Sequence, residues 1–176
     1  MLFSQKAEAL LGQLGIPSTL VAARGLREFQ EANVLEVAEF GNAGRQHLLV
    51  PAAAKAWRNL KGSAIEAGVS LFIVSAFRSF ERQAEIIKRK LSAFQSVSEV
   101  LSVSAPPCFS EHHTGRAVDI GTIGCPPLEA EFEDSVAFRW LQHHAESFSF
   151  IMSYPEGNEG GYQYEPWHWY YHIDPT

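Results

Sequence analysis

The chain has 176 residues, of which 46% are hydrophobic and 19% charged, so it is long enough to bury a core and too apolar to be intrinsically disordered. Its formal net charge is −6 and it has no long basic run, which argues against nucleic acid as a partner. No window approaches the roughly 18 consecutive apolar residues of a membrane span, so we expect a soluble protein with a single domain over residues 1–176.

Residues 1–50 predict one helix followed by a β-hairpin. The spacing of apolar residues indicates an amphipathic helix from about Ser4 to Leu14. The alternation in VLEVAEF predicts a strand that ends at the turn GNAG, with QHLLVP as its partner. Because the first residues show helical periodicity instead of the unbroken apolar run of a signal peptide, we expect a cytoplasmic protein, or an exported one whose leader has been trimmed.

A helix, a strand and a further helix are expected next. Pro51 suits the first turn of a helix that continues through AAAKAWRNLKGSAIEAG and is closed by Gly68. VSLFIVSAF is the most β-prone run of the chain and predicts a strand. SFERQAEIIKRKLSAF then predicts a helix, with Ser79 as its candidate N-cap.

The stretch from Ser104 to Pro127 is rich in Pro, Gly, Ser, Cys and His around one short strand, RAVDIGT, which is typical of functional loops on a scaffold. DSVAFRWLQHHAESF predicts a helix capped by Asp134 or Ser135, and SFIMSYP and EPWHWYYHI predict the last two strands. The predicted fold class is therefore α+β, with a small, largely antiparallel sheet and helices packed on it.

The segment SEHHTGRAVDI suggests a metal site. His112 and Asp119 lie on either side of Gly115, where a tight turn would bring imidazole and carboxylate together. His168, from YEPWHWYYH near the carboxyl end, completes a set of two His and one Asp. Catalytic zinc takes three such ligands and leaves its fourth position for water. We therefore expect one Zn²⁺ per chain.

Glu165 is the candidate general base, because it lies three residues before His168 and could take a proton from the attacking water. In a regular strand this offset would place the two side chains on opposite faces, so Pro166 must break the regularity. In the same segment, Trp167 and Trp169 are expected to pack against the sheet and to wall the cleft.

The remaining histidines have simpler interpretations. His113 is expected at the surface or behind the metal ligands. A solvated pair is the commoner outcome for His143 and His144 on a helix. His47 and His172 have no acidic or thiol partner nearby in the sequence, so no role is assigned to them.

The segment SAFRSFERQ offers Arg78 at the end of a strand and Gln83 a little over one helical turn later. An arginine at the edge of a cleft can bind a carboxylate with two hydrogen bonds or stabilise an oxyanion. An ordinary surface ion pair is the alternative, and this segment taken alone favours it.

Together, SAFRSFERQ, SEHHTGRAVDI and YPEGNEGGYQYEPWHWYY resemble the zinc D-alanyl-D-alanine carboxypeptidases of the VanY type, the M15 peptidases, which act on bacterial cell-wall peptides. The pattern S-x-H-x-x-G-x-A-x-D is met by Ser110, His112, Gly115, Ala117 and Asp119. The pattern E-x-W-H is met by Glu165, Trp167 and His168, and R-S-x-x-x-Q by Arg78, Ser79 and Gln83. The resemblance covers residues 75–172.

This resemblance implies a Hedgehog/DD-peptidase-like fold, zinc on His112, Asp119 and His168, and Glu165 as the base. It also implies that the free carboxylate of the peptide, or the tetrahedral intermediate, is received by Arg78, Gln83 and Ser110. The chain departs from the family pattern at two positions, because many relatives have arginine where this chain has Ser153 and Tyr170.

The resemblance leaves several functions open. The first is a carboxypeptidase that removes a terminal D-amino acid, D-alanine, from peptidoglycan stem peptides with D,D or L,D specificity. A D-Ala-D-Ala dipeptidase and an endopeptidase within the stem share the same site. A binding protein that keeps zinc without chemistry is the rival from another class, and an intact Glu165 counts against it. A structural zinc is weaker, because such sites are usually closed by four Cys or His ligands. The oligomeric state is not predicted.

Cys108 and Cys125 bracket the expected metal site. A disulfide between them would indicate an oxidising compartment and export, whereas two free thiols suit a cytoplasmic protein. The absence of a recognisable leader favours free thiols.

Overall fold

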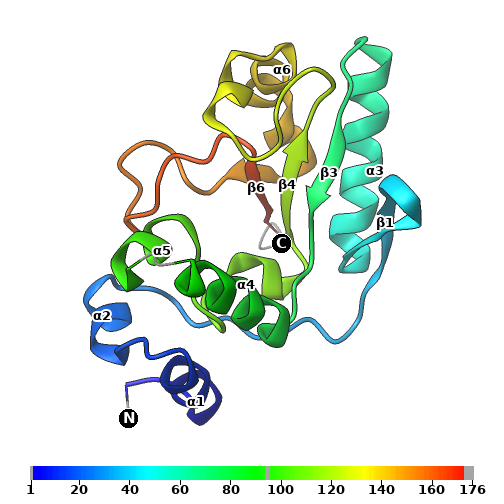
Figure 1. Cartoon of the computed structure of the whole chain (residues 1–176). Coiled ribbons are helices and arrows are strands. Elements are labelled where there is room, and N and C mark those ends of the chain that lie inside the picture. Colours follow the sequence, from blue (N-terminus) through cyan, green and yellow to red (C-terminus); the bar gives the residue numbers. More distant parts are fainter. Residues whose placement is uncertain (1, 94–95, 173–176) are drawn as a thin grey trace.

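The computed structural model describes residues 2–93 and 96–172. Its centre is a four-stranded antiparallel sheet in the order β3-β4-β6-β5 (Figure 1). The strands of this sheet are β3 (Phe72–Ser75), β4 (Ala117–Gly121), β5 (Phe150–Met152) and β6 (His168–Tyr171). A separate two-stranded hairpin is formed by β1 (Glu36–Phe40) and β2 (Gln46–Leu49). The predicted α+β class and both predicted hairpin strands are confirmed.

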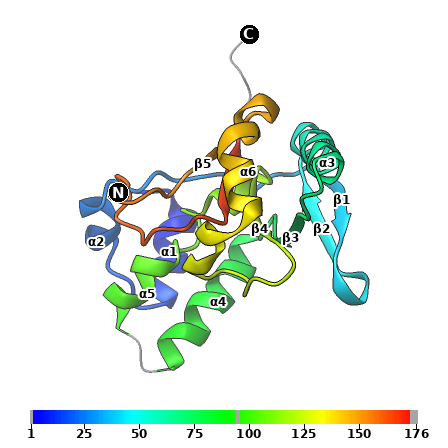
Figure 2. The ribbon, with the colours of Figure 1, turned by 90° about the horizontal axis from the view of Figure 1, so that it is seen from above.

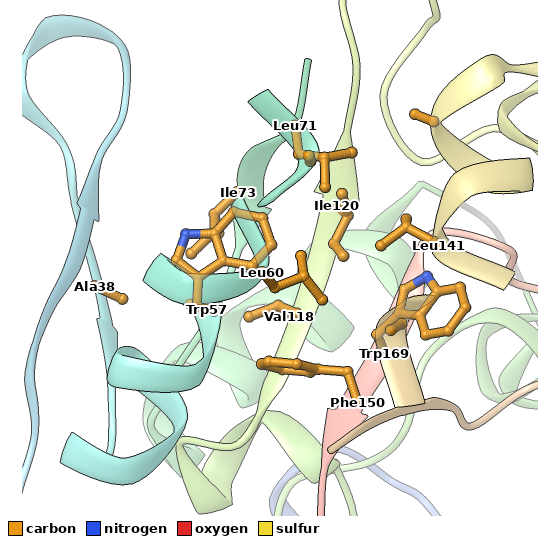
Figure 3. Packing of buried hydrophobic residues seen from close by; sticks show 14 of the residues in the cluster. Ala38, Trp57, Leu60, Leu71, Ile73, Val118, Ile120, Leu141, Phe150 and Trp169 are labelled. Carbon is orange, nitrogen blue, oxygen red and sulfur yellow. The ribbon is translucent and has the colours of Figure 1, made fainter. Parts of the chain in front are cut away.

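One face of the sheet is covered by α3 (Pro51–Glu66) and α6 (Val136–His144). Figure 3 shows Trp57 and Leu60 of α3 against Val118 and Ile120 of β4. Trp169 of β6 lies in the same cluster and is 4% exposed. Because successive strand residues point to opposite faces, residues between these core positions are directed away from α3.

A second hydrophobic cluster is formed by residues of four helices, which Figure 2 shows grouped on the side of the molecule away from α3. Its helices are α1 (Gln5–Gln13), α2 (Ser18–Ala23), α4 (Phe80–Ser92) and α5 (Val97–Val103). Phe109, at the start of the metal-site segment, packs into this cluster. Neither α2 nor α5 was predicted, because helices of six or seven residues carry too little periodic pattern and depend on tertiary packing.

The predicted helix caps agree with the structure. Ser4 begins α1, and Ser79 begins α4 by accepting a hydrogen bond from the backbone N–H of Arg82 at 3.1 Å. Of the two candidates for α6, Ser135 is the N-cap, since its hydroxyl oxygen accepts from Phe138 N–H at 3.0 Å. Gly68 follows α3 with φ of +73°, a conformation that suits glycine.

Hairpin β1–β2 is tied to the main sheet through Glu39. Its carboxylate accepts hydrogen bonds from Trp57 Nε1 at 2.9 Å and from the backbone N–H of Ile73 at 3.1 Å. Lys61 Nζ lies 2.9 Å from the same carboxylate. One partly buried acid therefore joins the hairpin, α3 and β3.

Both cysteines are free in the structure. Cys108 is buried in the second cluster, and burial raises the pKa of its thiol to about 12. Cys125 lies against the first cluster instead. The expected free thiols are present, while the cytoplasmic location itself stays a prediction. Over the described ranges 2–93 and 96–172, no helix combines the length and apolar character needed to cross a bilayer.

Candidate metal centre and substrate cleft

Two neighbouring strands and one turn position the three predicted metal ligands. Asp119 of β4 pairs with His168 of β6, so strand register places the two side chains on the same face. His112 lies in a 3₁₀ turn, Glu111–Thr114, that ends at Gly115 with φ of +65°. A Cβ at Gly115 would also lie 2.8 Å from Leu35 Cδ2. The predicted turn at Gly115 is confirmed, and its left-handed conformation favours glycine.

One donor atom from each of His112, Asp119 and His168 lies within 4.8 Å of the others. His112 Nε2 is 3.2 Å from Asp119 Oδ2, and His168 Nδ1 is 2.9 Å from Asp119 Oδ1. All three residues are buried, with exposed fractions of 1%, 5% and 2%. The residues that spacing alone singled out therefore converge on one point.

In His112 and His168, the ring nitrogen that does not face Asp119 is hydrogen-bonded to another group of the protein. His112 Nδ1 lies 2.7 Å from the carbonyl oxygen of Ala76, which can only accept, so Nδ1 carries the proton and Nε2 presents a lone pair. This Nε2 is buried and has no hydrogen-bond partner in the described chain. His168 Nε2 lies 2.9 Å from Glu111 Oε2 and donates to it, which directs Nδ1 at Asp119. Without a metal, the proton on His168 Nδ1 faces Asp119 at 2.9 Å, and a cation held by the two imidazoles and this carboxylate would take its place.

The electrostatics of the group depend on its two carboxylates. Burial alone would lower the pKa of His168, but hydrogen bonds to Asp119 and Glu111 outweigh it and raise the pKa to about 10. Burial and the charge of Arg78 lower the pKa of His112 to about 4. Burial would raise the pKa of Asp119, yet the two histidines hold it well below its usual range. The carboxylate thus stays ionised and can bind a cation.

Glu111 supports His168 from behind and was not predicted. Its Oε2 also accepts a hydrogen bond from the hydroxyl of Ser153 at 2.6 Å. The neutral hydroxyl of Ser153 is thus the side chain beside Glu111. The sequence signal was its position next to His112, but only the fold brings it to His168, 57 residues away.

Glu165 lies beside the ligands. The backbone N–H of His168 donates to Glu165 O at 3.1 Å, which closes a turn immediately before β6. The predicted break at Pro166 is therefore confirmed, and Glu165 Oε2 comes within 3.9 Å of His168 Nδ1. Burial raises the pKa of Glu165 to about 7.

A small cavity of about 50 Å³ adjoins the ligands. Four buried side-chain atoms without hydrogen-bond partners in the described chain belong to residues that line it: Arg78 Nε, Gln83 Oε1, His112 Nε2 and Tyr162 OH. Unpaired buried polar atoms are costly, so their concentration around one cavity indicates a polar ligand. Ser110, the third predicted substrate residue, lines the same cavity.

The polarity of these groups differs. Gln83 Nε2 donates to the carbonyl of Ala105 at 2.6 Å, so its Oε1 is an acceptor at the cavity. The hydroxyl of Tyr162 and Nε of Arg78 are donors. Tyr154 covers the site, with its ring centroid 4.6 Å from that of His168. Neither tyrosine was singled out from the sequence, where aromatic residues in a Gly-rich loop carry no distinctive signal.

A larger cleft of about 660 Å³ opens on the other side of Arg78 and Glu165, which line both spaces. Both tryptophans pack against the first hydrophobic cluster, as expected, but only Trp167 lines this cleft. The expectation that Trp169 also walls the cleft is wrong, because Trp169 is buried in the core.

The other histidines do not join the metal centre. Of the two positions expected for His113, the surface is wrong, because the residue is 0% exposed, and the position behind the ligands holds. Its Nδ1 lies 2.6 Å from the carbonyl of Arg78, so it holds the backbone of that arginine. His143 and His144 are exposed on α6, and each bonds a carbonyl of its own helix.

Three ligand donors, an adjacent carboxylate and a substrate-sized cleft form the type of site that metal-dependent hydrolases use. Residues 46–174 match the family model of VanY, D-alanyl-D-alanine carboxypeptidase, and the chain belongs to this family.

The chain resembles both curated and structurally characterised proteins. It is 34% identical over 119 residues to YodJ of Bacillus subtilis (strain 168), an overlap of 66% of this chain and 43% of YodJ. The LdcB LD-carboxypeptidase structure has a TM-score of 0.71 at 30% identity and covers 80% of this chain and 69% of that one. A VanY D,D-pentapeptidase solved with Zn(II) has a TM-score of 0.64 at 27% identity, over 81% and 80%. These structures confirm the expected DD-peptidase-like fold. The chain spans less than half the length of the curated relatives it matches.

Proposed function

We propose that this protein is a zinc-dependent carboxypeptidase that removes a terminal D-amino acid, D-alanine, from peptidoglycan stem peptides. The observation that carries the proposal is the small cavity beside the three ligand donors. It is small and polar, and Arg78 Nε and the hydroxyl of Tyr162 are donors there that suit a terminal carboxylate. The zinc-containing VanY structure and the LdcB LD-carboxypeptidase support the same class of reaction.

Zinc is proposed to bind His112 Nε2, Asp119 and His168 Nδ1. The donor set fits, since two of its members are imidazole nitrogens whose other nitrogen is already committed and the third is an ionised carboxylate. When bound there, the metal would supply a Lewis acid that polarises the scissile carbonyl and acidifies water.

The side chains around it divide the remaining work. Glu165 accepts a proton from the attacking water at its carboxylate and passes it to the leaving amine. Arg78 and the hydroxyl of Tyr162 hold the terminal carboxylate or the developing oxyanion in the small cavity. The role of Gln83 toward a carboxylate stays a prediction, because the atom it presents is an acceptor.

The dimensions of the site favour removal of one residue. A water-sized group needs about 10–15 Å³, so a cavity of about 50 Å³ holds roughly three to five such groups. The carboxylate and methyl group of alanine amount to four heavy atoms. An endopeptidase would need room on this side for further residues, and about 50 Å³ does not provide it. The cleft of about 660 Å³ on the opposite side accommodates a longer peptide than a dipeptidase requires.

The test is to incubate the zinc-loaded protein separately with a stem tetrapeptide and a stem pentapeptide and to identify the products by mass. Loss of one residue from the pentapeptide alone means D,D specificity, and loss from the tetrapeptide means L,D specificity. Release of D-Ala-D-Ala or a cut within the stem would contradict the proposal. Binding of both peptides without any product would indicate the non-catalytic alternative.

A further inference from the structure

The larger cleft has an unusual share of the protein's positive charge. Of the 14 basic residues in the chain, five line it: Arg45, Arg78, Arg82, Arg89 and Lys90. Of the 20 acidic residues, three line it, namely Asp119, Glu129 and Glu165. Asp119 and Glu165 belong to the metal centre. The rest of the cleft is therefore cationic in a protein of net charge −6.

Two separate elements provide these cations. Arg82, Arg89 and Lys90 lie on the face of α4 that borders the cleft, at spacings of seven and eight residues that return to one side of a helix. Arg45 comes from the turn between β1 and β2. Figure 2 shows α4 and this turn extending toward the same side of the molecule. We call Arg45, Arg82, Arg89 and Lys90 the cationic wall.

Most of this charge is available to a ligand. Among the described residues, Arg45 and Arg89 form no ion pair, and the pair of Arg82 with Glu85 is exposed on both sides (54% and 67%). Lys90 Nζ donates to the hydroxyl of Ser104 at 2.6 Å, a neutral partner that leaves the charge uncompensated. The cleft is also lined by Leu128, Tyr164 and Trp167, together with the acid Glu129.

The position of the wall fixes which part of a substrate it meets. If the terminal residue occupies the small cavity beyond Arg78, the chain on the N-terminal side of the scissile bond must leave through the larger cleft. Arg82 to Lys90 span eight residues of α4, or about 12 Å. An extended peptide rises about 3.3–3.6 Å per residue, so the wall runs beside roughly three to four residues.

We propose that the cationic wall binds free carboxylates carried on the N-terminal side of the scissile bond, so that the preferred substrate is an acidic stem peptide whose side-chain carboxyl groups are not amidated. This rests on the proposed function and specifies its substrate. A phosphate group is the other anionic chemistry, but cations spread over about 12 Å do not converge on one phosphate. Carboxylates spaced along a peptide match them.

The experiment uses two synthetic stem peptides that differ only in amidation of the internal carboxyl groups. Their binding to the zinc-loaded Glu165→Gln protein is measured by calorimetry, and kcat/KM is measured with the wild type. We expect the amidated peptide to bind about 2- to 10-fold more weakly. Arg89→Gln, added to the Glu165→Gln protein, should lower the affinity for the acidic peptide about 2- to 5-fold. It should leave the affinity for the amidated peptide unchanged. Arg45→Gln should do the same from a different element.

Lys88→Gln is the matched control, because Lys88 is exposed on α4 next to Arg89 and does not line the cleft. It should change neither affinity. Three results would contradict the proposal. The two peptides could bind equally well, Arg89→Gln and Lys88→Gln could have equal effects on affinity, or inorganic phosphate could compete with the peptide at constant ionic strength. Hydrolysis of both peptides at the same rate would contradict the role of the cationic wall and would still support the carboxypeptidase activity. Preferential binding of the acidic peptide without hydrolysis would support the role of the wall and contradict the carboxypeptidase activity.

Discussion

Replacing Glu111 tests whether the metal centre depends on a residue that does not touch the metal. Glu111 Oε2 lies 2.9 Å from His168 Nε2, and the two side chains are 18% and 3% exposed. This contact fixes the proton on Nε2 and aims Nδ1 at the proposed zinc. Loss of such a partner typically costs 10- to 100-fold in metal affinity, or about 1.4–2.7 kcal/mol.

The substitutions should follow a definite order. Glu111→Gln keeps an acceptor oxygen but loses the charge, so we expect about a 10-fold loss of zinc affinity. Glu111→Ala leaves the buried Nε2–H of His168 without a partner, so we expect about a 100-fold loss. Ser153→Ala removes only the hydroxyl that supports Glu111 and should have a smaller effect than either.

The zinc dissociation constant is measured by competition with a chromophoric chelator at constant pH, with circular dichroism to verify folding. Glu146→Gln is the control, since this exposed acid lies away from the ligands and makes no ion pair in the described chain. Wild-type affinity in folded Glu111→Ala protein would refute the reasoning and remove Glu111 from the centre.

Three further changes test the site and its support. His168→Ala should abolish stoichiometric zinc, measured by elemental analysis, while His143→Ala keeps it; the opposite result would show that the ligand assignment is wrong. Glu165→Gln should retain zinc and lower turnover by roughly 10²–10⁴, so near-normal turnover would move the base to another residue. Arg24 donates to two backbone carbonyls, those of α5 and the loop before β6, at 2.5 to 3.1 Å. Arg24→Ala should lower the free energy of unfolding by about 1–3 kcal/mol in denaturant titrations. Arg27→Ala, at an exposed position, should not lower it. Equal stabilities of the two variants would show that the hydrogen bonds of Arg24 do not stabilise the fold.

The sequence by itself determined the local elements and the identity of the donor set. Capping serines, strand alternation and the glycine turn at Gly115 act over a few residues, so their patterns are legible along the chain. His112 and Asp119 belong to the same turn and strand, and their convergence follows from that local geometry. His168 and Glu165 were assigned to the same site from their residue types and their spacing, and the resemblance to a known family implies the same roles.

Only the tertiary structure decided which distant side chains complete the site. Glu111 meets His168 across 57 residues, and Tyr162 joins Arg78 at the small cavity through a loop that no periodic pattern describes. The cationic wall combines the β1–β2 turn with α4 in the same way. These contacts depend on how the elements pack around the sheet, because residues far apart in the chain become neighbours only when burial of the two hydrophobic clusters fixes the positions of the helices.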